Sequence, residues 1–246
     1  MWRYLPWVLL VAFLVGLVGR TAVFAGRGMV AAGEWDGQKQ WVAGKVIVLD
    51  PGHGGDDPGV VVGAIREKEI TLPVALKTKE ILEAQGARVI LTRDSDIDLG
   101  GKIAEELGKR VQLVTEHGAQ LYVSIHANKL NCNCWGAQTF YQRGGTPQGK
   151  ALAFALQNQL RKWTPTTRTA LEANYFVLRT APVPAALVEV GFLSNGREAA
   201  NLRDPAYQGL VANAIALGIA DYFQQGSQPG SQQGSQQDGA LIKKAE

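Results

Sequence analysis

The sequence predicts an α/β domain, in which a twisted, mostly parallel β-sheet carries helices on both faces. One observation behind this prediction is that short apolar runs alternate with longer stretches whose apolar residues recur at helical spacing. Another is that glycines follow several of the helical stretches, as they do at helix ends. Strands that alternate with helices favour a parallel sheet covered on both sides. With 246 residues, 46% of them hydrophobic, the chain can hold one sizeable domain or two small ones.

Each element follows from a local pattern. Apolar runs predict strands at residues 46–49, 88–92, 121–125, 137–141, 175–178 and 185–190. Helical spacing predicts helices at residues 69–85, 102–117, 147–162 and 205–222. In the first helix Leu72, Leu76 and Leu82 share one face, and Gly86 ends the helix. No long crossover precedes the run at 137–141, so we expect that strand to run antiparallel at an edge of the sheet.

The amino-terminal residues 1–26 have a different character. Arg3 precedes an uncharged apolar run, Arg20 closes it, and small residues follow up to Ala25. This pattern predicts a secretory signal peptide or an uncleaved membrane anchor, with a buried amino-terminal helix as the alternative. A signal or an anchor would place the domain outside the cytoplasmic membrane.

The remaining boundaries follow from composition. Residues 27–44 are mixed and glycine-rich, and we interpret them as a linker. Residues 45–224 carry all the predicted strands and helices and form the folded unit. Residues 225–246 begin with repeated Gly-Ser-Gln, which cannot build a core, so we expect a disordered tail.

Charge and cysteine content exclude some classes of function. The chain has 25 basic and 22 acidic residues, and its net charge of +3 is too small to indicate nucleic-acid binding. Cys132 and Cys134 are separated by one residue, a spacing at which cysteines rarely bond to each other. Nor is this the Cys-x-x-Cys spacing of a structural zinc site. We therefore expect free loop thiols, with an unusual or intermolecular pairing as the alternative.

Three of the apolar runs lead to a residue that can bind a metal or move a proton. His53 follows the first strand in a glycine-rich turn, His126 follows the run at 121–125, and Glu189 lies in the run at 185–190. Ligands collect at the carboxyl ends of strands in open α/β sheets. The two histidines together suggest a zinc site, since catalytic zinc commonly takes three protein ligands and leaves the fourth position to water. Singly, His53 could be a surface-turn histidine and His126 a satisfied core histidine.

Residue patterns leave two candidates for the third ligand and two roles for Glu189. Glu67 and Glu69 both stand near the start of the helix at 69–85, where either could be a ligand or could simply favour the helix dipole. The residues alone leave that choice open. Glu189 lies among apolar residues, where an unpaired carboxylate is costly. The apolar surroundings would raise its pKa, which suits a general base beside a metal-bound water, while a buried salt bridge with an arginine is the alternative.

Four segments together resemble the signature segments of zinc-dependent N-acetylmuramoyl-L-alanine amidases. They occur in the family's order, as Leu-Asp-Pro-Gly-His-Gly-Gly at 49–55, Glu-Lys-Glu-Ile at 67–70, Ser-Ile-His-Ala-Asn at 124–128 and Val-Glu-Val-Gly-Phe-Leu-Ser-Asn at 188–195. The stretches at 109–114 and 136–141 resemble the spore-cortex branch of the family, which helps to make muramic δ-lactam.

The resemblance implies roles for individual residues. It makes His53, Glu67 and His126 the ligands of one zinc ion and Glu189 the catalytic carboxylate, so it chooses Glu67 over Glu69. Two further residues are our own candidates for positioning the substrate, Asn128 and Arg179. The interpretation of Arg179 rests only on its place after the predicted strand at 175–178, and a surface role is the alternative.

The resemblance also implies a fold and a function. The fold is a twisted sheet of about six strands with flanking helices. The reaction is hydrolysis of the amide between the lactyl group of N-acetylmuramic acid and L-alanine in peptidoglycan, with a deacetylase as a functional partner. The alternatives are another zinc hydrolase of cell-wall material, a peptidase or a deacetylase, and a non-catalytic wall-binding protein. No separate wall-binding module is visible.

Overall fold

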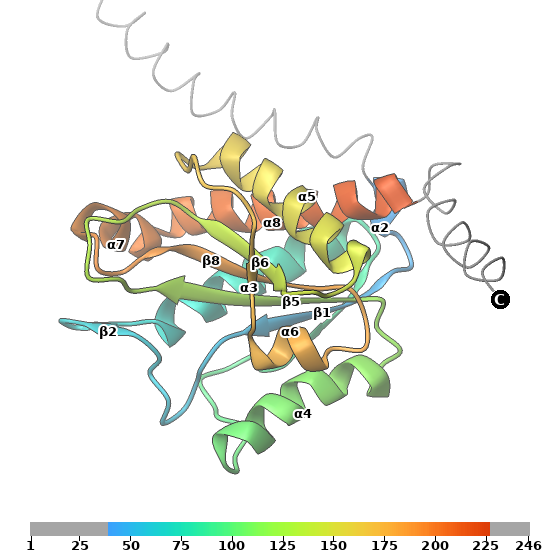
Figure 1. Cartoon of the computed structure of the whole chain (residues 1–246), viewed down its shortest axis with the longest axis horizontal. Helices are drawn as coiled ribbons and strands as arrows, with labels where there is room; N and C mark the ends of the chain where they lie inside the picture. The colour runs from blue at the N-terminus through green and yellow to red at the C-terminus, as the bar shows by residue number, and fades with distance from the viewer. Residues whose placement is uncertain (1–38, 227–246) are drawn as a thin grey trace, which may run out of the picture. The chain divides into compact units, whose positions relative to one another are not determined.

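A six-stranded sheet organises residues 39–226, the part of the chain that the computed structural model describes (Figure 1). Its strands are β1 (Val46–Pro51), β4 (Arg88–Leu91), β5 (Leu121–Asn128), β6 (Gln138–Gln142), β7 (Leu171–Ala173) and β8 (Ala185–Phe192). They lie in the order β4-β1-β5-β8-β6-β7. The first four are parallel, β6 runs antiparallel to β8, and β7 is parallel to β6. The predicted class, a mostly parallel α/β sheet, is confirmed.

Helices cover both faces of this sheet (Figure 1). One face carries α3 (Lys68–Ala84), α5 (Pro147–Trp163) and α8 (Pro205–Gly226). The other face carries α4 (Ile103–Glu116) and α6 (Phe176–Thr180). The remaining short elements are α2 (Lys39–Val42), α7 (Gly196–Arg203) and a hairpin of β2 (Val61–Val62) and β3 (Ile65–Arg66).

Packing on the two faces explains why the sheet strands are almost entirely apolar. On one face α8 packs against α5, and a Cβ on Gly218 would lie 2.6 Å from the Leu156 Cα, so only glycine allows the helices this close. On the other face the core joins Val48 and Tyr122 of the sheet to Val111 of α4. Strands buried on both faces show continuous apolar runs rather than alternation, as the sequence does here.

Two predictions about the late strands were wrong. Residues 175–178 are not a strand, because α6 occupies Phe176–Thr180. An apolar run this short fits either a strand or one face of a helical turn, and here Val177 and Leu178 pack on the α4 side of the sheet. The edges of the sheet are β4 and β7, so β6 lies inside the sheet although it runs antiparallel as predicted. The helix α7 and the β2–β3 hairpin were not predicted.

The signal or anchor at 1–26, most of the linker at 27–44 and the tail beyond Gly226 lie outside the described residues. At the end of the predicted linker, α2 is helical, and its Val42 is fully buried. Among residues 39–226, no helix has the length and apolar character needed to cross a membrane.

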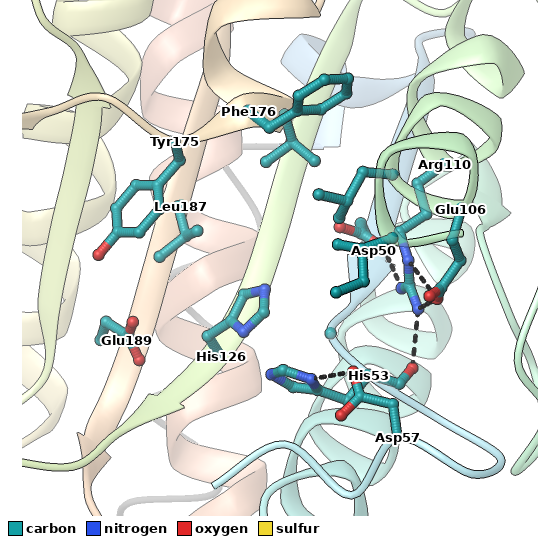
Figure 2. Close-up of a pocket in the computed structure, with 14 residues that line it drawn as sticks. Asp50, His53, Asp57, Glu106, Arg110, His126, Tyr175, Phe176, Leu187 and Glu189 are labelled. Atoms are coloured by element: carbon teal, nitrogen blue, oxygen red, sulfur yellow. Dashed lines mark hydrogen bonds and ion pairs between the residues drawn. The ribbon is translucent and has the colours of Figure 1, made fainter. Parts of the chain in front are cut away.

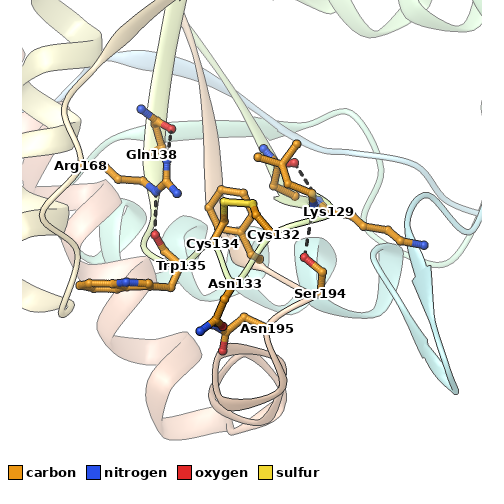
Figure 3. Close-up of a disulfide and its surroundings, with 12 residues drawn as sticks. Lys129, Cys132, Asn133, Cys134, Trp135, Gln138, Arg168, Ser194 and Asn195 are labelled. Atoms are coloured by element: carbon orange, nitrogen blue, oxygen red, sulfur yellow. Dashed lines mark hydrogen bonds between the residues drawn. A yellow bond between two sulfur atoms is a disulfide. The ribbon is translucent and has the colours of Figure 1, made fainter.

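The expectation of free thiols was wrong, because Cys132 and Cys134 form a disulfide (Figure 3). The loop after β5 bends so that their Cα atoms lie 5.1 Å apart, within the range that a disulfide can bridge. Contacts to the turn before α7 hold this loop: Asn195 Nδ2 donates to Asn133 Oδ1 at 3.0 Å, and Leu130 N donates to Ser194 Oγ at 3.2 Å.

Candidate metal centre and active site

The carboxyl ends of β1, β5 and β8 bring the three predicted strand-end residues together. β1 pairs with β5, and β5 pairs with β8, so the three ends share one edge of the sheet. β5 continues to Asn128, beyond its predicted end, and this places His126 within the strand. His126 is the register partner of Glu189 on β8. His53 lies just past the end of β1, and its ring centroid is 5.0 Å from that of His126.

Glu67 completes the group from the start of a helix. It is the N-cap residue of α3 and is only 2% exposed. Its Oε2 lies 3.1 Å from His53 Nε2, and its Oε1 lies 2.9 Å from His126 Nδ1. Backbone N–H groups of Val60 and Ala127 donate to the two carboxylate oxygens, at 2.8 and 2.9 Å. Both oxygens are therefore held in a fixed orientation between the histidines.

Glu69 does not take part in this group. It is exposed, and its carboxylate pairs with Arg66 at 2.9 Å. The structure thus separates the two glutamates that residue patterns alone could not distinguish.

In the turn that carries His53, glycine backbone packs closely against the rings of His53 and His126. His53 has a φ of 62°, in the left-handed region. A Cβ on Gly59 would lie 2.5 Å from His53 Cδ2, and one on Gly52 would lie 2.3 Å from His126 Cε1. Both positions therefore require glycine for the rings to sit where they do. On its far side the His53 ring is fixed by Asp57, whose Oδ2 lies 2.6 Å from Nδ1 (Figure 2).

These contacts fit a metal centre. One ligand atom each from His53, Glu67 and His126 lies within 4.8 Å of the others. Two imidazole nitrogens and one carboxylate oxygen form a donor set found in catalytic zinc sites. The Asp57 contact to Nδ1 leaves Nε2 of His53 facing the group, as is usual for a metal-binding histidine with an outer carboxylate. The residues present therefore can hold a metal ion.

The electrostatics of the three residues show how strongly they interact. Burial lowers the pKa of His53, but the Glu67 carboxylate and then Asp57 outweigh it and raise this pKa to about 9. Burial likewise opposes ionisation of Glu67, yet the hydrogen bonds and charges of His126 and His53 hold its pKa well below the usual range. A negative carboxylate at this point favours a cation, whether a proton or a metal ion.

Glu189 stands beside this group with an unused oxygen. The residue is 8% exposed, and its buried Oε2 has no hydrogen-bond partner among the described residues. No arginine of residues 39–226 forms an ion pair with it, so the salt-bridge alternative has no support. Burial raises the pKa of Glu189 to about 7, against the opposing effect of His126. A carboxylate with such a pKa can accept and release a proton near neutral pH.

Two cavities meet at these residues. The larger, of about 540 Å³, has an apolar wall from α4, α6 and β8 (Figure 2). That wall consists of Ile103, Leu107, Tyr175, Phe176, Val177 and Leu187. The second, of about 510 Å³, has Asn128 and Lys129 in its lining. Both include His53, His126 and Glu189, so a substrate lying across the cleft would pass over the group.

The two candidate substrate-positioning residues differ in their placement. Asn128 lines the second cavity, and its Oδ1 accepts from Lys129 N at 2.7 Å. Arg179 lines neither cavity. It lies in α6, not after a strand, and its guanidinium donates to Asn174 Oδ1 at 2.7 Å. Asn174 lies outside both linings as well. Its guanidinium also lies over the ring of Phe176, 5.6 Å from the ring centre, so Arg179 reaches the first cavity only through that lining residue.

Sequence reasoning missed two residues of the site. Asp57 holds the His53 ring, and a carboxylate four residues after a candidate ligand is a signal that could have identified it. Tyr175 lies beside the cavity near Glu189 (Figure 2). No residue pattern around Tyr175 indicated a place in the site.

Comparisons with known proteins point to one family. The family model described as N-acetylmuramoyl-L-alanine amidase matches residues 47–221, a range that includes the His-Glu-His group and Glu189. The germination-specific N-acetylmuramoyl-L-alanine amidase of Bacillus subtilis is 42% identical over 208 residues, covering 79% of this chain and 87% of that protein.

Solved structures of amidases are also similar to this chain. The CwlD amidase from Clostridioides difficile, in complex with the GerS lipoprotein, matches with a TM-score of 0.70 at 34% identity, over 74% of this chain and 99% of that one. The catalytic domain of CwlV, an N-acetylmuramoyl-L-alanine amidase from Bacillus (Paenibacillus) polymyxa var. colistinus, matches with a TM-score of 0.67 at 37% identity, over 73% and 98%.

Proposed function

The chain belongs to the N-acetylmuramoyl-L-alanine amidase family, and we propose that it works with one zinc ion held by His53, Glu67 and His126 and with Glu189 as the general base. As a member of this family it is an enzyme that acts on peptidoglycan, at the amide between N-acetylmuramic acid and L-alanine. The family assignment takes the place of the two alternatives, another kind of zinc hydrolase and a non-catalytic wall-binding protein.

The observation that carries the proposal is the unpartnered Glu189 carboxylate beside the His-Glu-His group. A buried carboxylate without a partner is costly, and such groups are kept where they act. When bound, zinc supplies Lewis-acid chemistry, since it polarises the carbonyl of the amide and lowers the pKa of water. The donor set of two imidazoles and one carboxylate leaves a position for that chemistry.

Glu189 transfers the proton in this reaction, and other residues of the chain keep the ligands oriented. Glu189 takes a proton from the attacking water as the water oxygen bonds to the lactyl carbonyl carbon. When the carbon–nitrogen bond breaks, Glu189 gives this proton to the nitrogen of L-alanine, which leaves as the amine of the stem peptide. Asp57 keeps the His53 ring oriented throughout, and Glu67 stays fixed by the backbone N–H groups of Val60 and Ala127. Asn128 lies on the rim, where it can position the substrate.

The same proposal covers the layout of the chain. We propose a catalytic unit at 45–224, with a signal peptide or anchor at 1–26, a linker at 27–44 and a tail at 225–246. Cell-wall amidases among the relatives support action outside the cytoplasmic membrane. A secreted or membrane-anchored form is the finer part of this proposal. Mass spectrometry of the amino terminus of the mature protein distinguishes cleavage near Ala25 from an intact anchor.

A role in the spore cortex is supported by the germination-specific relative of Bacillus subtilis. We assign the chain to the step that removes the stem peptide before muramic δ-lactam forms. Muropeptide analysis of spores that lack the chain tests this role, and cortex with normal lactam content would contradict it.

The partner proposed from the comparisons differs from the one that the sequence resemblance implied. The solved CwlD amidase is bound to a lipoprotein, GerS, which supports a lipoprotein partner for this chain rather than a deacetylase. Stoichiometric co-purification with a lipidated protein from the same cells tests the proposal. Full activity and stability of the chain alone, with no such complex, would contradict it.

Product analysis tests the reaction itself. Peptidoglycan digested by the purified protein should yield new L-alanine amino termini and free lactyl carboxylates. Free acetate would indicate a deacetylase, and new amino termini within the stem peptide would indicate a peptidase.

A further inference from the structure

The backbone of His53 is held in an unusual conformation. Its φ of 62° is the only positive value at a non-glycine residue among the described residues. A side chain with a Cβ rarely adopts this region, and such backbones persist when surrounding contacts fix them. The contacts that fix it here come from outside the turn.

Two buried arginines bind the carbonyl groups of this turn. Arg93 donates from Nε to Pro51 O at 3.0 Å and from an Nη to Gly52 O at 2.9 Å. Arg110 donates to Pro51 O at 3.0 Å and to His53 O at 2.9 Å. Both side chains are 2% exposed. Among the side chains of residues 39–226, only that of Arg110 binds the carbonyl of His53 itself.

Arg110 is in turn fixed from two sides (Figure 2). Its Nη1 donates to Asp50 Oδ1 at 2.8 Å, and its Nη2 donates to Glu106 Oε1 at 2.5 Å. The same Nη2 therefore binds both Glu106 and the carbonyl of His53. Asp50 is anchored by three hydroxyl groups, those of Thr92, Tyr122 and Ser124. A rigid chain of contacts thus runs from the sheet and α4 to the His53 backbone.

We infer that Arg110 is a positioning residue, which holds the His53 backbone in the left-handed conformation that points the imidazole at the Glu67 carboxylate. Asp57 fixes the ring of His53 at Nδ1, and Arg110 fixes the main chain that carries the ring. The role of Arg110 rests on the proposed function, in which His53 is a metal ligand. Groups that orient a ligand in this way typically contribute about 10- to 100-fold to metal affinity.

A lysine substitution at each arginine tests this role with a matched control. Arg110→Lys and Arg93→Lys both keep a buried positive charge at the same turn, but lysine cannot bridge several acceptors in fixed directions. We expect the zinc dissociation constant of Arg110→Lys, measured by chelator competition, to rise about tenfold or more. Arg93→Lys should change it by less than about threefold. Equal losses in the two variants would overturn the inference, because either arginine would then only support the turn.

Cobalt supplies a readout that does not depend on catalysis. The visible absorption of protein loaded with Co²⁺ reports the geometry of the ligands. It should be altered in Arg110→Lys and like that of the wild type in Arg93→Lys. A spectrum and zinc affinity in Arg110→Lys that match those of the wild type would overturn the inference.

If Arg110→Lys does not fold, the milder variant Glu106→Gln tests the role of Arg110. Glu106→Gln keeps the size of a side chain that is 15% exposed but weakens its hold on Arg110. We expect a threefold or larger rise in the zinc dissociation constant with an unchanged melting temperature, and unchanged zinc binding would overturn the inference. Wild-type protein that binds no zinc, or His126→Ala that binds it normally, would instead contradict the proposed ligand set.

Discussion

Glu189 lies directly opposite His126 in the register of the neighbouring parallel strands β5 and β8. This relationship places a buried carboxylate beside a group that can bind a metal without making it part of that group. One strand end therefore supplies a ligand candidate, and the next supplies the candidate for proton transfer.

Replacing Glu189 should separate metal binding from turnover. Glu189→Gln keeps the shape of the side chain but cannot accept a proton, so we expect a loss of about 10²- to 10⁴-fold in kcat with zinc content unchanged. Metal analysis and release of stem peptide from peptidoglycan measure the two properties. Turnover at the wild-type rate would disprove the role of Glu189 as a base.

The two neighbouring glutamates at the start of α3 form a natural pair of variants. Glu67→Gln removes a ligand candidate and should weaken zinc binding by more than about 100-fold, beyond the effect of an outer-shell change. Glu69→Gln removes an exposed carboxylate whose one ion pair within the described part of the chain is with Arg66, and it should leave zinc binding unchanged. Zinc titration by calorimetry compares them. Similar affinities in the two variants would refute the choice of Glu67.

Close packing at Gly52 predicts a steric effect on the site. In Gly52→Ala the new methyl group would lie 2.3 Å from the His126 ring, so the ring must move and zinc affinity should fall. Overpacking of this kind also destabilises proteins by about 1–3 kcal/mol. Gly108→Ala, in α4, is the control: no atom from elsewhere in residues 39–226 lies within 4 Å of its new methyl group, so it should be neutral or stabilising. Gly52→Ala protein that binds zinc like the wild type would contradict the geometry.

The buried Asp50–Arg110 pair predicts how stability depends on pH. The pKa of Asp50 is lowered to about 2: burial opposes this, but the Arg110 charge and the hydrogen bonds of three hydroxyl groups outweigh it. A folded-state pKa below the unfolded value means that the stabilisation is present above about pH 4 and is lost as pH falls towards 2. Its size is on the order of 2 kcal/mol.

Comparison with Asp50→Asn isolates this contribution. The wild type should be the more stable protein near pH 6, and the difference in free energy of unfolding should shrink below about pH 4. Chemical denaturation across this range measures it. A difference that stays constant down to pH 2 would show that Asp50 does not titrate as described.

The disulfide is expected to contribute little to stability. It closes a loop with a sequence separation of only 2, so the entropy that it removes from the unfolded chain is small. The double variant Cys132→Ser with Cys134→Ser should lose about 1.5 kcal/mol or less. Thermal unfolding measures the loss, and thiol labelling of native protein checks the bond itself. Two reactive thiols in oxidised protein would show that the cysteines are free after all.

The class of fold and the strand-end residues could be predicted because they depend on local patterns. Apolar runs identify buried strands, and parallel strands necessarily bring their carboxyl ends to one edge, so the sequence alone groups His53, His126 and Glu189. Glu67 could not be chosen over Glu69 from periodicity, because both stand at the same helix start. Their difference is tertiary, since only Glu67 faces the histidines.

Other features could not be predicted from the sequence because they depend on packing, loop geometry or long-range contacts. The run at 175–178 is too short to distinguish a strand from α6, and only its packing against α4 decides. The Cys132–Cys134 bond depends on a local bend of the loop. Arg110 contacts His53 across 57 positions of sequence, a relationship that no local pattern reveals.

Zinc titration of activity tests the central claim most directly. Metal-free protein is given increasing zinc, and the rate at which new L-alanine amino termini appear in peptidoglycan is measured by mass spectrometry. The proposed site predicts no activity without metal and full activity at one zinc per chain. Activity that persists in metal-free protein, or that needs more than one zinc per chain, would contradict it.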